Sequence, residues 1–212
     1  MHIAVSGNIG SGKTTLTGML AKHFNWDPMY ENTDNNPYLA SFYEDMQRWS
    51  FNLQIYFLNK RFRQIVDIHK KKKHTIQDRT IYEDAYIFAP NLHNMGLMAS
   101  RDFENYKSLF ELMGSFIQPP DLLIYLQADT STLVAQIQKR GRNYENSIRI
   151  DYLQGLNKLY EQWITLYEQQ YVRTGQSKLL TIDINTIKFA EKAEDFGTII
   201  EKINAELFGL FK

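Results

Sequence analysis

A glycine-rich stretch near the start of the sequence has the residue types that hold phosphate groups. Residues 7–14 read GNIGSGKT and fit the pattern G-x-x-x-x-G-K-[ST]. Its three glycines permit a tight loop whose backbone amides surround phosphate oxygens. Lys13 can reach the outer phosphates, and Thr14 can be a ligand of Mg²⁺. The predicted nucleotide-binding residues of this loop are Gly7, Asn8, Ile9, Gly10, Ser11, Gly12, Lys13, Thr14 and Thr15.

Other charged residues stand where apolar stretches end. Glu31, Asp78 and Asp183 each close such a stretch, and Arg79 follows directly after Asp78. Ligands of parallel sheets gather beyond the carboxyl ends of the strands, so these side chains are candidates for a site. The alternatives are a surface carboxylate at Glu31 and a structural salt bridge between Asp78 and Arg79.

A pair of arginines further along could act on the same phosphates. Arg140 and Arg142 flank Gly141 in the segment KRGR, directly after an amphipathic stretch. Two cations around a glycine suit a mobile lid that closes over a triphosphate. The alternative is an ordinary basic end of a helix.

The elements that position these residues alternate along the chain. Short apolar stretches predict strands at 2–6, 27–31, 74–78, 121–128 and 178–183. Longer helical patterns separate them, at 13–24, 38–72, 80–95, 102–117, 130–140, 150–172 and 187–208. Strands separated by helices predict a helix-rich, three-layer α/β/α fold around a five-stranded parallel sheet.

Length and composition limit the class of protein. The 212 residues predict one domain, 1–212, and the 24 cationic and 24 acidic side chains cancel, which argues against nucleic acid as a partner. No cysteine is present, the first strand leaves no room for a leader, and no apolar run approaches the ~20 residues of a membrane helix. We therefore expect a soluble, cytoplasmic protein without a membrane partner. The histidines show no metal-ligand spacing, and the run HKKKKH at 69–74 is interpreted as a solvated helix end.

The phosphate loop alone does not choose among switches, motors and small-molecule kinases. A GTP-dependent switch carries N-K-x-D, and the segment NKRF at Asn59 lacks the aspartate. No predicted strand ends in the adjacent acidic residues of many ATPase motors. A kinase for a small acceptor needs an acceptor pocket and arginines near the phosphates, which leaves Arg79, Arg140 and Arg142 as the relevant cations.

Four segments resemble those of the deoxynucleoside kinases. QDRTIYEDAYIFA at 77–89 is similar to the D/E-R-S motif and the helix that follows it. FYEDMQRWSFNLQIY at 42–56 resembles the sugar- and base-binding segment, YLQADTSTLVAQIQKRGRNYEN at 125–146 the lid, and LLTIDIN at 179–185 the last strand with its adenine-side loop. The resemblance covers nearly the whole chain. It implies a P-loop NTPase fold, ATP as donor, Mg²⁺, a deoxynucleoside as acceptor, and a homodimer.

The resemblance also implies catalytic roles. Glu31 is the general base that takes the proton from the 5′-hydroxyl group, while Arg79 and Lys13 supply positive charge to the transferring phosphoryl group. Asp78 and Thr14 hold Mg²⁺. Arg140 and Arg142 belong to a short lid at about 140–149 and contact the triphosphate.

The remaining implied residues bind the nucleoside. Tyr43 and Glu145 reach the sugar 3′-hydroxyl group. Gln54, Arg61 and Asp84 bind the base edge, and Phe88 stacks on the base; Gln54 and Arg61 are two helical turns apart and face the same way. Without the resemblance, Gln54 and Arg61 are more simply explained as part of a solvated face, and Phe88 could equally belong to the core. The substrate-binding set is Glu31, Tyr43, Gln54, Arg61, Arg79, Asp84, Phe88 and Glu145.

An arginine–aspartate pair at positions 61 and 84 resembles members that accept purines or deoxycytidine rather than thymidine. Two other functions stay open at this point. One is a nucleoside-monophosphate kinase, although the segment around Glu31 lacks cations for an acceptor phosphate. The other is a catalytically silent P-loop protein, although Lys13, Glu31 and Arg79 are all present.

Overall fold

Five parallel strands form a single sheet in the computed structural model, which describes residues 1–31, 36–142 and 148–209. The strands are β1 (His2–Gly7), β2 (Asp27–Met29), β3 (Thr75–Asp78), β4 (Leu122–Gln127) and β5 (Lys178–Asp183). Their order across the sheet is β2-β3-β1-β4-β5, and every adjacent pair is parallel. The predicted five-stranded parallel sheet is confirmed.

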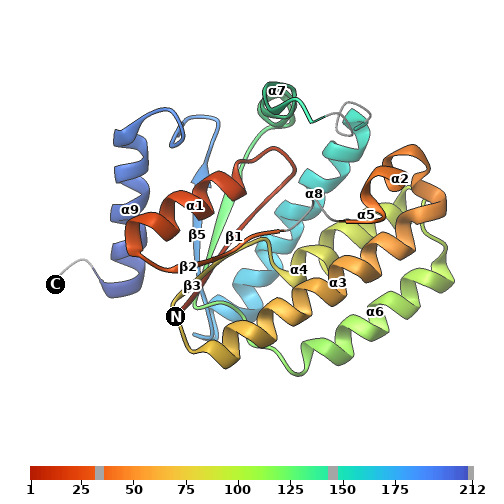
Figure 1. Ribbon diagram of the computed structural model, residues 1–212, viewed down its shortest axis with the longest axis horizontal. Helices are drawn as coiled ribbons and strands as arrows, with labels where there is room; N and C mark the ends of the chain where they lie inside the picture. Colours follow the sequence, from red (N-terminus) through yellow and green to blue (C-terminus); the bar gives the residue numbers. More distant parts are fainter. Residues whose placement is uncertain (32–35, 143–147, 210–212) are drawn as a thin grey trace.

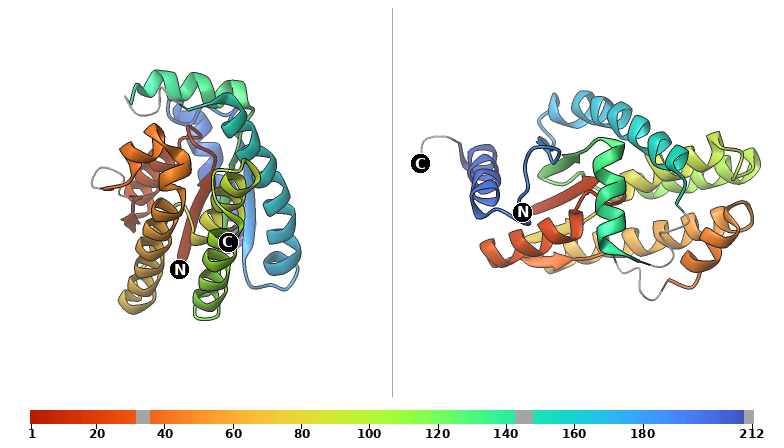
Figure 2. Two further views of the ribbon diagram at one scale, coloured as in Figure 1. Left: turned by 90° about the vertical axis from the view of Figure 1, so that its right-hand side faces the viewer. Right: turned by 90° about the horizontal axis from the view of Figure 1, so that it is seen from above.

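Helices cover both faces of this sheet (Figures 1 and 2). On one side lie α1 and α9, and on the other α3, α6 and α8. The helices of the described chain are α1 (Lys13–Phe24), α2 (Leu39–Glu44), α3 (Met46–Lys71), α4 (Ile81–Glu83), the π-helical η1 (Asp84–Phe88), α5 (Ala89–Asn94), α6 (Ser100–Gly114), α7 (Thr130–Arg140), α8 (Ile150–Tyr167), the π-helical η3 (Glu168–Val172) and α9 (Ala193–Phe208).

The central strands carry apolar side chains on both sides because both of their faces are buried. In β1, Ile3 and Val5 belong to the core beneath α1 and α9, whereas Ala4 belongs to the core beneath α3, α6 and α8. Alternate residues of a strand point to opposite faces, so a doubly covered strand is apolar throughout. Leu122 and Leu123 of β4 divide between the two cores in the same way.

The predicted helix 38–72 is interrupted. Asp45 adopts a non-helical conformation (φ −141°, ψ 85°) and accepts a hydrogen bond from the backbone N–H of Arg48, which makes it the N-cap of α3. An aspartate satisfies this orphan N–H well, so the chain restarts a helix instead of continuing one. The break lets α2 fold over the end of α3.

The predicted helix 80–95 contains a wider turn. The backbone N–H of Ala89 donates to the carbonyl of Asp84, five residues earlier, and defines η1. Pro90 follows, and a proline has no N–H to donate to the carbonyl four residues before it. A π turn accommodates this without ending the helix, and such turns are frequent at functional sites.

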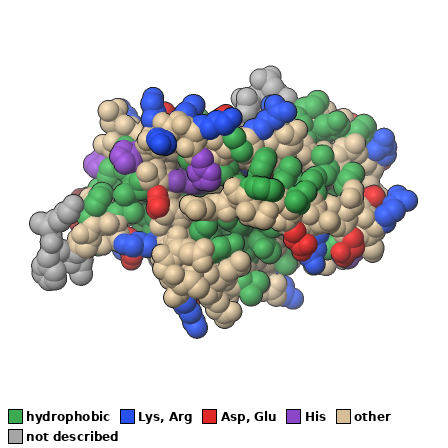
Figure 3. Space-filling model, turned by 90° about the horizontal axis from the view of Figure 1, so that it is seen from below, with side chains coloured by type: hydrophobic (Ala, Val, Ile, Leu, Met, Phe, Trp, Pro, Cys, Tyr) green, Lys and Arg blue, Asp and Glu red, His purple; other side chains and the backbone are tan. Residues whose placement is uncertain are grey.

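Several predicted boundaries move by a few residues. β2 ends at Met29, two residues before Glu31, and the last helix begins at Ala193, not at residue 187. The run 69–74 is exposed between the end of α3 and the start of β3, as interpreted from the sequence. It belongs to the side where the strands begin, a mixture of apolar and charged side chains (Figure 3). Among the described helices, none is both long and apolar enough to cross a membrane.

The packing of α8 on α5 predicts opposite effects for two Gly→Ala substitutions. A Cβ on Gly155 would lie 2.3 Å from Oδ1 of Asn91, a buried residue whose amide donates to the carbonyl of Tyr152. Gly155→Ala should therefore lower the free energy of unfolding by about 1–3 kcal/mol. Gly197 of α9 has no described atom within 4 Å of such a Cβ.

Gly197→Ala is the matched control, and it should raise the free energy of unfolding by about 0.5–1 kcal/mol through helix propensity. Urea denaturation of both variants measures the difference. Stabilisation by Gly155→Ala would contradict the tight α5–α8 contact.

Candidate active site

The predicted phosphate loop joins the end of β1 to the start of α1. Gly10 and Gly12 have positive φ angles of 86° and 87°, which L-residues with a side chain rarely adopt. A Cβ on Gly10 would also lie 2.9 Å from the carbonyl oxygen of Leu133. The N–H of Ser11 donates to the carbonyl of Asn8 at 3.2 Å and closes the turn. The loop therefore has the tight form that the motif predicts.

Lys13 is buried at the start of α1, and its Nζ donates to the carbonyl of Asn8 at 2.9 Å. Burial, and next the nearby Arg79, lower the pKa of Lys13 to about 8. An anionic ligand in this loop would relieve that repulsion. The side chain of Asn8 donates to the carbonyl of Leu153 and to Asn157 Oδ1, at 3.1 and 2.7 Å, and its Oδ1 accepts from the N–H of Ile9 at 2.7 Å.

Asp78 and Thr14 meet beside Lys13. The hydroxyl of Thr14 donates to Asp78 Oδ2 at 2.6 Å, while Asp78 Oδ1 is buried without a hydrogen-bond partner. Burial raises the pKa of Asp78. An orphaned carboxylate oxygen next to a hydroxyl suits Mg²⁺, which takes few protein ligands and completes its shell with phosphate and water. Within the described residues, no group of three or more acidic, histidine or cysteine side chains could hold a metal by itself.

Arg79 has a backbone conformation that turns its side chain into the site. Its φ is +68°, unusual for a residue with a Cβ and most often retained at functional positions. The guanidinium is buried, lies 4.3 Å from the ring centroid of Phe88, and places Nε 3.3 Å from Glu31 Oε2. The residue therefore presents a fixed positive charge next to Glu31 and Lys13.

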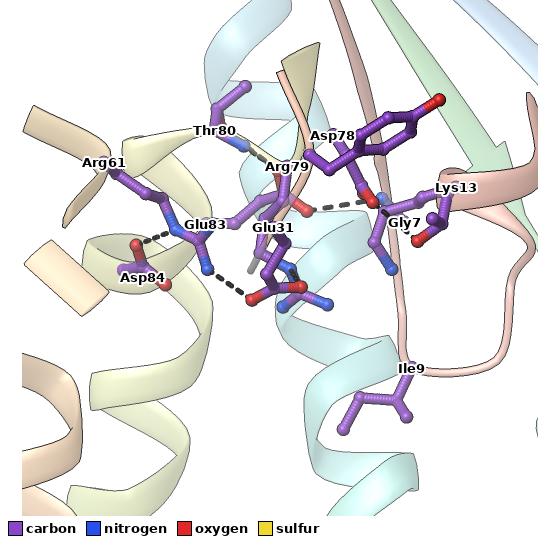
Figure 4. A network of polar contacts seen from close by, with 12 residues as sticks. Gly7, Ile9, Lys13, Glu31, Arg61, Asp78, Arg79, Thr80, Glu83 and Asp84 are labelled. Carbon is purple, nitrogen blue, oxygen red and sulfur yellow. Dashed lines mark hydrogen bonds and ion pairs between the residues drawn. The ribbon is translucent and has the colours of Figure 1, made fainter. Parts of the chain in front are cut away.

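Glu31, Arg61 and Asp84 form a chain of ion pairs at the same edge of the sheet (Figure 4). Arg61 Nη2 donates to Glu31 Oε1 at 2.7 Å, and Arg61 Nε donates to Asp84 Oδ2. Burial raises the pKa of Glu31, but Arg79 and Arg61 together outweigh it and bring the pKa to about 2. Burial raises the pKa of Asp84 to about 6, against the opposing effect of Arg61. Both carboxylates are therefore ionised at neutral pH.

These residues surround a pocket of about 700 Å³ between the sheet edge, α2, α3 and η1. Seven of the eight predicted substrate-binding residues line it. They are Glu31, Tyr43, Gln54, Arg61, Arg79, Asp84 and Phe88. The eighth, Glu145, lies outside the described residues. Gln54 is buried and its Oε1 has no hydrogen-bond partner, so the pocket wall carries an unsatisfied acceptor.

A second pocket of about 700 Å³ lies on the other side of the phosphate loop, against α7 and the loop after β5. Gly12, Thr15 and Phe189 line it. Five predicted nucleotide-binding residues are common to both pockets: Gly10, Lys13, Thr14, Arg140 and Arg142. Two pockets that meet at a cationic phosphate loop can hold two reactants and pass a phosphoryl group between them.

Two further residues, Glu83 and Tyr152, were not predicted from the sequence. Tyr152 of α8 lines the first pocket. Glu83 is fully buried, and its carboxylate accepts from the backbone N–H groups of Gly7 and Thr80. The pattern T-x-x-E at 80–83 signals a capping box and could have pointed to Glu83. No spacing in the sequence points to Tyr152.

Comparison with known proteins identifies the family. The family model described as deoxynucleoside kinase matches residues 3–208. The chain is 42% identical over 165 residues to the deoxyadenosine/deoxycytidine kinase of Bacillus subtilis (strain 168), covering 77% of this chain and 76% of that protein. It is 36% identical over 210 residues to a deoxyguanosine kinase of Lactobacillus johnsonii, covering 97% and 92%.

A solved structure extends this similarity to the fold. Deoxyadenosine kinase from M. mycoides, with the products dCMP and a flexible dCDP bound, superposes with a TM-score of 0.83 and 28% identity, over 97% of this chain and all of that chain. The resemblance inferred from the four sequence segments is thus confirmed. The chain belongs to the deoxynucleoside kinase family, and it is an enzyme that phosphorylates a hydroxyl group of a nucleoside.

Proposed function

We propose that the protein transfers the γ-phosphoryl group of ATP to the 5′-hydroxyl group of a deoxynucleoside, in nucleotide salvage. The transfer is a direct in-line displacement. Purine deoxynucleosides or deoxycytidine are favoured over thymidine, and a purine is the preferred acceptor. The observation that carries this proposal is the pair of pockets that share Lys13, Thr14, Arg140 and Arg142.

The donor side follows from this geometry. The second pocket takes ATP, with its triphosphate in the loop at 7–15 and its γ-phosphate beside Lys13. Arg140 and Arg142 close over it from a lid at about 140–149. Asp78 and Thr14 would hold Mg²⁺, which would supply positive charge to the phosphates. The unpartnered Oδ1 of Asp78 supports this assignment.

On the acceptor side, Glu31 is the general base. Its low pKa makes it a weak base, yet the nucleoside hydroxyl becomes acidic as its oxygen bonds to phosphorus, so a positioned weak base suffices late in the reaction. Arg61 and Arg79 each contact one oxygen of Glu31, which fixes the orientation of the carboxylate. Arg79 also supplies fixed positive charge where negative charge moves.

The first pocket supplies groups for the sugar and the base. Phe88 offers an aromatic face, which Arg79 covers from one side. Gln54 presents its unpartnered oxygen to the base edge, where an amide can both donate and accept. Tyr43 and Glu145 are assigned to the sugar 3′-hydroxyl group.

The protein is proposed to act in the cytoplasm as a homodimer of single-domain subunits. Large apolar side chains remain exposed on the helical side of the molecule, and a second copy of the chain could cover them. They are Tyr86, Leu112, Phe116 and Leu166, with exposed fractions of 38, 61, 71 and 54%. Sedimentation equilibrium tests the oligomeric state.

The Lys13 prediction tests the phosphate loop. Lys13→Ala should nearly abolish turnover without unfolding the protein, because it removes charge from the transferring phosphoryl group. Lys22→Ala, on the exposed end of the same helix, is the matched control. The measurements are turnover with Mg·ATP and the melting temperature. A folded Lys13→Ala enzyme with near-normal turnover would contradict the proposed mechanism.

The Glu31 prediction tests the general base. Glu31→Gln keeps the shape and removes the proton acceptor, so turnover should fall about 10²–10⁴-fold, while nucleoside binding changes less. Glu44→Gln, on the exposed end of α2, should be neutral. Steady-state kinetics separate the two effects. A loss below about threefold, far under that range, would remove Glu31 from the role and make Asp78 the next candidate.

The choice of base depends on Arg61 and Asp84. Asp84 can accept from the amine of adenine or cytosine, and it fixes Arg61 beside it; thymine presents a carbonyl to Asp84 and a methyl group to Arg61. An unpaired buried polar group costs about 1–3 kcal/mol, which is roughly 5- to 150-fold in selectivity. Thymidine should therefore be the poorest of the four deoxynucleosides.

The experiment compares kcat/KM for all four deoxynucleosides, well above pH 6, where Asp84, with its pKa of about 6, is ionised. Arg61→Met combined with Asp84→Ala should raise the relative use of thymidine. Arg63→Met, an exposed change on the same helix, should leave the ranking as it is. Thymidine as the best substrate of the unaltered protein would overturn the assignment of the pair but not the kinase.

A further inference from the structure

Glu83 is a fully buried carboxylate that contacts neither pocket directly. One of its oxygens, Oε2, accepts from the backbone N–H of Thr80 at 2.7 Å and lies 3.2 Å from the Thr80 hydroxyl. The other, Oε1, accepts from the N–H of Gly7 at 3.3 Å and from the Tyr160 hydroxyl at 2.8 Å. A buried charge needs hydrogen-bond partners. Those of Glu83 come from three separate parts of the chain.

Two of the partners of Glu83, Thr80 and Gly7, lie next to the segments that carry Arg79 and Lys13 (Figure 4). Thr80 directly follows Arg79, whose backbone is held at a positive φ. Gly7 is the first residue of the phosphate loop, six residues before Lys13. Glu83 therefore joins the backbone beside Arg79 to the backbone that leads to Lys13.

Tyr160 of α8 reinforces the same connection. Its buried hydroxyl lies 2.7 Å from the carbonyl oxygen of Gly7 as well as 2.8 Å from Glu83. It thus contacts the first peptide of the phosphate loop and the carboxylate that fixes the second loop. The ring stacks on Tyr125 of β4, with centroids 5.9 Å apart, so the hydroxyl has little freedom to move.

We propose that Glu83, with Tyr160, is a positioning residue for phosphoryl transfer. The pair fixes the Arg79 backbone relative to the phosphate loop, so that Arg79 and Lys13 address the same phosphoryl group. This inference rests on the proposed function of Arg79 and Lys13. Tyr160 and Glu83 act through those cations and touch no substrate.

If Glu83 only capped the helix, one of its two carboxylate oxygens would be enough. A capping box accepts glutamine as readily as glutamate, because one oxygen is enough for the N-cap N–H. Glutamine cannot also accept from Gly7, since its second position is an NH₂ donor facing an N–H. Glu83→Gln therefore retains the cap at Thr80 and breaks the connection to the phosphate loop.

The test uses Glu83→Gln and Tyr160→Phe, with Tyr167→Phe as the matched control. Tyr167 is also a buried residue of α8, and its hydroxyl lies 2.7 Å from Ser177 Oγ, away from both pockets. Both test variants should lose about 5- to 150-fold in kcat with Mg·ATP, the effect of one buried polar contact, and KM for the deoxynucleoside should change little. Tyr167→Phe should lower the melting temperature similarly and keep its kcat.

Two results would overturn the inference: full kcat in folded Tyr160→Phe or Glu83→Gln, or an equal loss of kcat in Tyr167→Phe. The double variant Glu83→Gln, Tyr160→Phe should lose less than the product of the single losses, because both act on one connection. If the loss of kcat in the double variant equals the product of the two single losses, Glu83 and Tyr160 do not act on one connection. Failure of this inference can be distinguished from failure of the proposed function. Only in the second case would Lys13→Ala retain activity.

Discussion

The pairing of buried charges at the carboxyl edge of the sheet governs the architecture of this enzyme. Glu31 lies between Arg61 and Arg79, and Arg61 is shared with Asp84. Burial, and next the nearby Arg79, lower the pKa of Lys13. An isolated buried charge is strongly disfavoured, so each of these groups is tolerated because of its neighbours. The charged residues at this edge therefore form one network. Each element that carries one of them must be in its native position for the others to be paired.

The order of the strands in the sheet brings those elements together. β1 is central, with β3 on one side and β4 on the other, so the phosphate loop emerges beside the turn that carries Asp78 and Arg79. β2 lies beyond β3 and delivers Glu31 from the outer side. The long α3 then places Arg61 against both Glu31 and Asp84. Strand order thus determines which charges become neighbours.

The sequence predicted the parallel sheet and the tight loop at 7–14, because both depend on local patterns. Seven residues that the resemblance of whole segments grouped together line the first pocket, and their proposed roles stay predictions. The sequence was not sufficient for the interruption at Asp45 or the π turn at Asp84–Phe88, where one cap or one proline overrides helical periodicity. It also missed the contact of Glu83 with Gly7. Residues 76 positions apart meet there only because β1 and β3 are adjacent, which no spacing expresses.

The π turn has a consequence for how the sequence can vary. An added residue rotates everything after it by about 100° around the helix axis, since an α-helix has 3.6 residues per turn. The segment before the turn keeps the angular phase that Glu83 needs, whereas Asn91 after it keeps the phase that packs against Gly155. The two halves of one continuous helix are thereby offset by a fixed angle. Deleting one residue of the π turn would rotate Asn91 by about 100° away from Gly155, or Glu83 away from Thr80 and Gly7, so this helix can satisfy both contacts only at its present length.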